Sequence, residues 1–350
     1  MTYVSTHPAL KGGLLALLAA ALFGLSTPMV QYLGQGIGAF TTAAMLYTGS
    51  AIVAWVLKKP ATEEAGLQKQ DGLRLLAIAG TGAVIGPVAL AWGLQHTSGA
   101  SASLMLTLEA VFTVILAWLW YDETLDRRVA TAVFLLLIGG AVLVIEQGAL
   151  GQVQLWGLLA VTLATAAWGV DNTLSRGLAD RDPGQVVLFK SLLGTACTFV
   201  LAVLSHEPAP SVLKALGLMA VGATGYGLSL RFYLLAQRTF GAARTGSVFA
   251  FAPFIGAMGA FAFGDRSVSG LMITAGLLML AGVLLHLLEA HAHAHTHQAH
   301  AHEHAHVHDD GHHNHVHPHM PMGAHSHLHQ HEQLTHGHAH VPDVHHGHTH

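Results

Sequence analysis

Long apolar segments separated by short polar or turn-forming breaks fill the first 290 residues of the chain. They lie at 12–33, 37–57, 73–94, 98–120, 129–146, 155–177, 185–204, 212–235, 244–263 and 268–288. A helix rises 1.5 Å per residue, so about 20 apolar residues are needed to cross the hydrocarbon layer of a membrane. The pattern therefore predicts an all-α polytopic membrane protein with ten transmembrane helices. The tightest breaks are expected at Gly34 to Gly38 and at Gln95 to Thr97.

The basic residues of the connecting loops give an independent test of this count. If the N-terminus is cytoplasmic, most basic loop residues fall on the inner side: Lys11, Lys58, Lys59, Lys69, Arg74, Arg127, Arg128, Arg176, Arg181, Arg238 and Arg244. The outer side receives only Lys214 and Arg266. This bias follows the positive-inside rule. It predicts a multi-pass protein of the bacterial inner membrane with both termini in the cytoplasm.

The two halves of the apolar region repeat each other. Gly12 to Pro28 (GGLLALLAAALFGLSTP) overlays Gly157 to Thr173 (GLLAVTLATAAWGVDNT), and the QxTxGA pattern at 95–100 returns at 237–242. Each half has five segments, an odd number, so the second half must be inverted in the membrane relative to the first. Inverted repeats of this kind usually enclose a substrate site near the middle of the membrane.

Three stretches of the sequence carry a family resemblance. They are LTLEAVFTVILAWLWYDETLDRR (106–128), WGVDNTLSR (168–176) and GYGLSLRFYLLAQRTFGAARTGSVFAFAPFIGA (225–257). These resemble the EamA type of the drug/metabolite transporter superfamily, and in particular a bacterial subgroup whose members end in histidine-rich tails. The resemblance implies two EamA-like five-helix repeats around a central cavity, and secondary transport, often export, of small solutes. The halves differ at one point, since Phe251 stands where the first half has Glu109.

The resulting division of the chain has four parts. Residues 1–11 form a short cytoplasmic N-terminus, 12–146 the first EamA-like repeat, 152–288 the second and inverted repeat, and 289–350 a cytoplasmic tail.

Glu109 is a candidate site residue because it lies near the middle of its apolar segment. A charge inside hydrocarbon is costly and should face the bundle interior or water. Glu109 is therefore predicted to be a coupling or substrate-binding carboxylate. The alternative is a structural carboxylate that bonds to a neighbouring helix or pairs with Arg231. Arg231 itself either faces the interior, the favoured interpretation, or extends toward the cytoplasmic boundary.

Asp171 and Lys190 are expected at similar depth on adjacent antiparallel helices, because they lie ten and nine residues from position 181. An ion pair between them would offset the cost of removing both charges from water. A structural pair is the first interpretation, and a gate or a substrate contact is the second. Asn172 either faces the cavity or caps a local helix irregularity. Prolines within the segments, among them Pro87, are expected to kink helices and expose carbonyl groups.

The tail is crowded with histidines, since residues 291–350 hold 25 of the 29 in the chain. It has almost no large apolar residues, so it is predicted to be disordered. Imidazole binds Zn, Ni, Cu and Co, and metal binding is predicted at His291, His293, His295, His297, His300, His302, His304, His306, His308, His312, His313, His315, His317, His319, His345, His346, His348 and His350. The alternatives are a pH-responsive polyelectrolyte and a tail without a role.

Composition and motifs remove several classes of function. Basic residues are few, so a nucleic-acid binder is excluded. The sequence has a single cysteine, which permits no internal disulfide. No phosphate-binding GxxxxGK[ST] loop, HExxH or GxSxG motif is present, so an enzyme or an ATP-driven pump is not expected and no cofactor is required.

Three functions therefore remain. The first is a secondary transporter, an exporter as the resemblance implies, that moves a small metabolite or drug-like solute by alternating access. The second is a divalent metal transporter or metal-regulated permease, and the third is a membrane-anchored metal buffer or sensor that transports nothing. The partners are a small-molecule substrate, the lipid bilayer and metal ions at the tail. The oligomeric state is open, with a homodimer among the alternatives.

Overall fold

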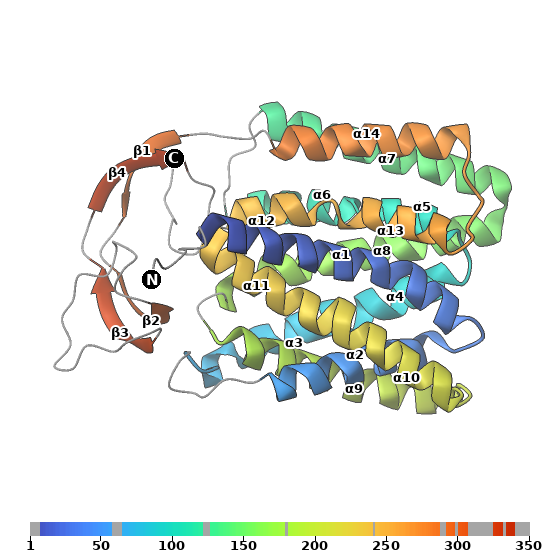
Figure 1. Ribbon diagram of the computed structural model, residues 1–350, viewed down its shortest axis with the longest axis horizontal. Coiled ribbons are helices and arrows are strands. Elements are labelled where there is room, and N and C mark those ends of the chain that lie inside the picture. The colour runs from blue at the N-terminus through green and yellow to red at the C-terminus, as the bar shows by residue number, and fades with distance from the viewer. Residues whose placement is uncertain are drawn as a thin grey trace, which may run out of the picture.

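The computed structural model describes most of the membrane region and parts of the tail. The described residues are 8–57, 65–121, 127–178, 181–240, 242–287, 292–297, 300–306, 325–331 and 334–339. The helices run side by side as one bundle, and the strands of the tail lie beyond one end of it (Figure 1).

The first half of the bundle is built from seven helical elements and two irregular turns. They are α1 (Pro8–Gly34), α2 (Ala39–Val56), η1 (Lys69–Asp71), α3 (Gly72–Ala79), η2 (Gly80–Ile85), α4 (Gly86–Leu94), α5 (Gly99–Met105), α6 (Leu108–Tyr121) and α7 (Arg127–Leu150). The turn η2 is a π-helix that joins α3 to α4. Together η1, α3, η2 and α4 form one membrane span, and α5 with α6 forms the next.

The second half repeats this arrangement. Its elements are α8 (Gln152–Ser175), η3 (Arg176–Leu178), α9 (Pro183–Leu204), α10 (Val212–Val221), η4 (Gly222–Leu228), α11 (Ser229–Phe240), α12 (Ala242–Phe249), α13 (Ala252–Ala262) and α14 (Gly270–Leu287). The turn η4 is also a π-helix, and it occupies the place that η2 has in the first half.

The described part of the chain holds nine spans long and apolar enough to cross a membrane, and α14 adds a shorter apolar helix. The predicted breaks are confirmed, because α1 ends at Gly34 before α2 begins at Ala39, and α4 ends at Leu94 before α5 begins at Gly99. Helix α1 begins and α14 ends at the same end of the bundle, as an even number of crossings requires (Figure 1).

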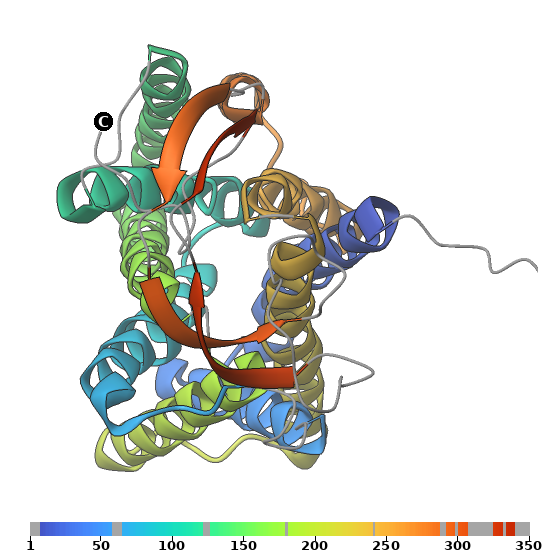
Figure 2. The same cartoon turned by 90° about the vertical axis from the view of Figure 1, so that its left-hand side faces the viewer.

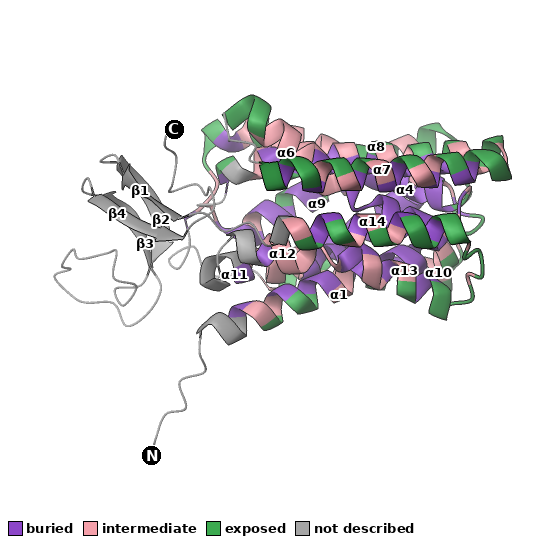
Figure 3. Cartoon of the chain, turned by 90° about the horizontal axis from the view of Figure 1, so that it is seen from above, coloured by how far each residue is buried: buried purple, intermediate pink, exposed green. Residues whose placement is uncertain are grey.

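The outward faces of the helices are apolar and exposed. Figure 3 shows exposed stretches along the outer helices and buried stretches between them. The exposed side chains include many large apolar ones, such as Leu14, Leu18, Trp55, Phe134, Trp156, Phe199 and Leu277. Such a surface would be costly in water and suits contact with lipid.

The packing of the helices follows the internal repeat. Helix α1 packs against α11 and α13 of the second half, and α8 packs correspondingly against α4 and α6 of the first. Helix α2 packs on α9, and α7 packs on α14. Viewed along the bundle axis, the helices surround a central region (Figure 2). The interface between the halves therefore runs through the middle of the molecule.

The structure differs from the expectation of disorder in parts of the tail. Four segments form strands, β1 (Ala292–His297), β2 (His300–His306), β3 (His325–His331) and β4 (Leu334–Ala339). Strand β1 pairs with β4 and β2 with β3, both antiparallel. The physical reason is the alternation of histidine with small or polar residues, which has the period of two that suits a strand.

The predicted metal-binding histidines fall in two groups. The backbone of seven is described, on β1 and β2: His293, His295, His297, His300, His302, His304 and His306. The others lie outside the described residues: His291, His308, His312, His313, His315, His317, His319, His345, His346, His348 and His350.

Candidate functional site

A proline creates a free carbonyl group at the centre of the first half. In η2 the N–H of Gly86 donates to the carbonyl of Thr81, which is the spacing of a π-helix. The carbonyl of Gly82 would need the N–H of residue 87 at the same spacing, and Pro87 has none. Side chains from both halves fill this vacancy. The Tyr47 hydroxyl of α2 donates to the Gly82 carbonyl at 2.5 Å, and the Trp168 indole N–H of α8 donates at 3.0 Å.

A buried ion pair lies directly beside this turn. Lys190 Nζ of α9 donates to Asp171 Oδ2 of α8, and both side chains are buried. A Cβ atom on Gly82 would come within 2.3 Å of Asp171 Oδ2 and 2.7 Å of Lys190 Nζ. The missing side chain of Gly82 therefore gives the ion pair its space. The pair predicted from the sequence is confirmed.

Glu109 forms a second polar contact, between α6 of the first half and α8 of the second. Its Oε1 atom accepts a hydrogen bond of 2.6 Å from Asn172 Nδ2. Glu109 lies in the first turn of α6, just after the break that ends α5 at Met105. It is half-buried, whereas Asn172 is exposed. The predicted candidates Glu109, Asp171, Asn172 and Lys190 therefore lie together, and Asn172 bonds to Glu109 instead of capping a helix.

Asn172 of α8 belongs to the second half and bonds to Glu109 of α6 in the first half. It lies one helical turn from Trp168 on the same face of α8. The Trp168 ring meets the ring of Phe23 on α1, with centroids 5.8 Å apart. Helix α1 also belongs to the first half, so Trp168 and Asn172 both contact the first half from α8, and the Glu109–Asn172 bond lies at the interface between the halves.

Aromatic rings line the region around Phe23. Its ring contacts those of Tyr226 at 6.0 Å and Phe249 at 5.4 Å, and Tyr226 in turn contacts Tyr47 at 5.7 Å. These rings come from α1, α2, η4 and α12. Phe23 and Phe249 are half-buried, so part of each ring remains accessible. A carboxylate and an aromatic cluster thus share the centre of the bundle.

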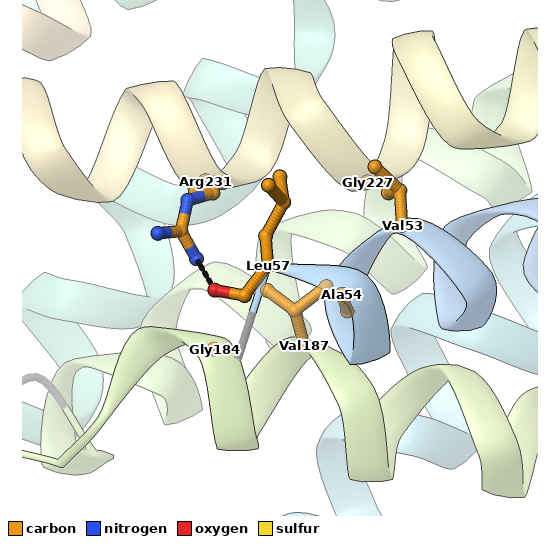
Figure 4. Close-up of a pocket in the computed structure, with 7 residues that line it drawn as sticks. All are labelled: Val53, Ala54, Leu57, Gly184, Val187, Gly227 and Arg231. Carbon is orange, nitrogen blue, oxygen red and sulfur yellow. Dashed lines mark hydrogen bonds between the residues drawn. The ribbon is translucent and has the colours of Figure 1, made fainter. Parts of the chain in front are cut away.

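Arg231 lies elsewhere, and the interior placement favoured by the sequence is corrected. Its Nη1 atom donates to the carbonyl of Leu57, the residue that ends α2, at 3.0 Å (Figure 4). A small pocket lined by Val53, Leu57, Val187 and other side chains surrounds this contact. A free helix C-terminus carries unpaired carbonyls and partial negative charge, which attract a cation. Arg231 therefore caps the C-terminal end of α2 and does not pair with Glu109.

Side-chain hydrogen bonds connect the spans at the end of the bundle opposite the start of α1. Gln31 Nε2 donates to the carbonyls of Leu94 and Thr97, both at 3.1 Å. The Thr97 hydroxyl donates to Gln147 Oε1 at 3.0 Å, and Gln147 Nε2 donates to Ser101 Oγ at 3.2 Å. These bonds tie α1, α4, α5 and α7 together on one side of the membrane.

Two acidic side chains join the halves at the same end. Glu207 accepts hydrogen bonds from the backbone N–H groups of Phe40 at 3.2 Å and Thr41 at 2.7 Å, at the start of α2. Asp265 accepts a bond of 3.0 Å from the N–H of Ala100, at the start of α5. Both carboxylates lie where the positive end of a helix dipole favours them.

The loop position of Asp265 affects its ionisation. Burial raises the pKa of its carboxyl. Hydrogen bonds from Ser267 and from the Ala100 backbone lower the pKa by more than burial raises it. The pKa therefore lies below its usual value, and Asp265 stays ionised as a helix cap at neutral pH.

Sequence reasoning missed the aromatic cluster and the Gly82 carbonyl. The expectation that prolines expose carbonyls was the available signal, since Pro87 lies five residues after Gly82. The donors to that carbonyl come from α2 and α8, and no local pattern in the sequence connects them.

Inverted pairs of five-span halves that meet at a polar centre define a class of polytopic membrane transport proteins. The comparisons agree with this class. The model of the EamA-like transporter family matches residues 10–145 and again residues 155–288. The chain belongs to the EamA-like transporter family.

Two further similarities support the assignment. An uncharacterized transporter of Methanothermobacter thermautotrophicus is 27% identical over 295 residues, which cover 78% of this chain and 85% of that protein. A protein of known crystal structure has a TM-score of 0.56 at 18% identity, and the match covers 78% of this chain and 94% of that one. The second similarity concerns the fold alone.

Proposed function

We propose that the protein is a secondary transporter that exports a small organic solute from the bacterial cytoplasm by alternating access, with both termini on the cytoplasmic side. The observation that carries this proposal is the half-buried Glu109, which bonds to Asn172 at the interface between the halves. A carboxylate placed there can exchange a proton or contact a solute as each side opens in turn. Asp171, Asn172 and Lys190 shape the pathway, and Arg231 stabilises its inner end.

The bonds at the outer end support one step of this cycle. Gln31, Glu207 and Asp265 each connect segments that would have to separate for the centre to open outward. Asn172, in contrast, is exposed and lies near the inner end of α8. These observations favour a conformation that is closed on the outside and accessible from the inside.

Replacing Glu109 with Gln is expected to abolish coupled export. Cells that overproduce the protein should resist at least one toxic amine, amino-acid analogue or metabolite in a growth panel, and Glu109→Gln should lose this resistance at every pH. The charged groups facing Glu109 are Asp171 and Lys190, and both are kept in this variant. Gln preserves the hydrogen bond to Asn172 but cannot release a proton.

Glu146→Gln is the matched control. Glu146 is also a buried carboxylate, but it bonds to Ser269 near the outer end. This variant should keep the resistance. Resistance of Glu109→Gln cells equal to wild type, with the same dependence on pH, would remove Glu109 from the mechanism.

The tail is proposed to bind divalent Zn, Ni, Co or Cu in the cytoplasm and to regulate transport. Alternating histidines on the paired strands place many imidazole-bearing residues close together along the backbone. Deleting residues 291–350 should remove most metal binding by the purified protein, measured by calorimetry, and should change the metal tolerance of cells. Unchanged metal tolerance in the deletion strain would argue against a metal function, and an unchanged organic-solute phenotype would assign transport to the helices alone.

A further inference from the structure

Glu109 is a carboxylate without a basic partner in the described part of the chain. Its hydrogen-bond partner is the neutral amide of Asn172. The two basic side chains that the sequence placed near it are engaged with other groups, since Lys190 pairs with Asp171 and Arg231 bonds to the Leu57 carbonyl. The ion pair is neutral overall, so among the side chains described at the centre of the bundle an ionised Glu109 has no counter-charge.

The wall opposite this carboxylate is aromatic. Phe23 and Phe249 are in ring contact, and both are half-buried. Phe251, also half-buried, stands at the break between α12 and α13, the position that corresponds to Glu109 in the repeat. An inverted repeat places such equivalent positions on either side of the central axis. The repeat therefore sets Phe251 opposite Glu109, and the Phe23 ring contacts Trp168, which lies one helical turn from the Asn172 that bonds to Glu109.

We propose that the centre of the bundle binds an organic monocation with an aromatic or apolar body, held between Glu109 and the rings of Phe23, Phe249 and Phe251. The proposal rests on the proposed transport function and names its substrate class. The ammonium group of the ligand supplies the positive charge that Glu109 lacks, and it can donate a hydrogen bond to the carboxylate. Aromatic faces attract both an apolar body and a cation.

The Glu109 carboxylate and the paired Lys190 also discriminate between ligands of different charge. An anionic solute would bring a second negative charge next to Glu109, and Lys190 is not free to neutralise it. A neutral solute would bury its apolar body against the rings but would leave the carboxylate without a counter-charge. Charge should therefore decide affinity among ligands with the same ring.

The test uses purified full-length protein and three compounds that carry a phenyl ring on a short carbon chain and differ in the charge of the end group: 2-phenylethylamine, 2-phenylethanol and phenylacetate. Binding is measured by titration calorimetry at pH 7.5, with protein-free micelles as the blank. The amine should bind at least about tenfold more tightly than the alcohol, and phenylacetate should bind most weakly, because an ion pair in a partly dehydrated site changes affinity by a factor of ten or more. In Glu109→Gln the advantage of the amine over the alcohol should disappear, while binding of the alcohol is retained and shows that the variant is folded.

Two further variants sharpen the result. Glu146→Gln should keep the preference for the amine, and Phe23→Leu should weaken the amine and the alcohol alike. Three outcomes would overturn the proposal: an amine preference that persists in Glu109→Gln, equal affinity for the three compounds, or no binding of any of them at millimolar concentration.

Counterflow of the same compounds in proteoliposomes separates this proposal from the transport function. Glu109-dependent binding of the amine without flux of any compound would overturn transport and leave the ligand class in place. Flux of the alcohol or the anion without an amine preference would overturn the ligand class and leave transport in place.

Discussion

Replacing Asp171 with Asn is expected to destabilise the protein by about 3–5 kcal/mol, because it leaves Lys190 as a buried charge without a partner. Both side chains are buried, at 5% and 6% exposure, so water cannot compensate for the loss. Lys190→Met should have a similar effect by leaving the carboxylate unpaired. The measurement is the thermal unfolding of purified protein in one detergent, followed for both single variants.

The double variant Asp171→Asn/Lys190→Met is the control for this prediction. It removes both charges, and replacing a buried ion pair by neutral groups is often close to neutral in stability. The double variant should therefore be more stable than either single variant. Additive losses in the double variant would show that the two side chains stabilise the protein through separate contacts.

The spans were predictable because hydrocarbon imposes a simple rule. Every backbone polar group must be satisfied within the helix, so spans appear as long apolar runs with polar breaks. The C-terminal ends of α1, α2 and α4 agree with the ends predicted from the sequence to within two residues. The ion pair was predictable for a related reason, because helix rise fixes the depth of Asp171 and Lys190 on either side of a short connection.

The site was less predictable where it depends on lateral packing. The rotation of each helix about its axis is set by contacts between distant segments, such as that of Tyr47 with the carbonyl of Gly82. Arg231 illustrates the problem. Its distance from the membrane boundary allowed two placements, and the end of α2 beside it decided between them.

The two halves share a fold but differ at their centres. The ion pair of Asp171 and Lys190 lies against η2. In the overlay of the repeats, Ser26 of the first half corresponds to Asp171. Ser26 lies against the second π-turn, because a Cβ atom on Gly225 would come within 2.5 Å of Ser26 Cβ. The second half thus packs charged groups against the π-turn of the first half, whereas the first half packs a small hydroxyl against the π-turn of the second. This asymmetry, with Glu109 present in one half only, gives the central site a single acidic wall.

The contact between α2 and η4 leads to the second large effect, which is expected for Gly222→Ala. A Cβ atom on Gly222 would lie 1.8 Å from the carbonyl oxygen of Leu46, and a backbone atom cannot rotate away as a side chain does. The helices would have to separate, which should cost about 3 kcal/mol or more, at the upper end for an overpacked core.

Gly80 provides the matched control for this change. Gly80 begins η2 as Gly222 begins η4, but no atom lies within 4 Å of a Cβ atom built on it. Gly80→Ala should therefore leave the stability unchanged or raise it by up to about 1 kcal/mol, since alanine favours a helix over glycine. Thermal unfolding of the two variants in the same detergent compares them directly. Equal unfolding temperatures would mean that α2 and η4 are not in close backbone contact, and the packing of the halves around the central site would then have to differ from the one described.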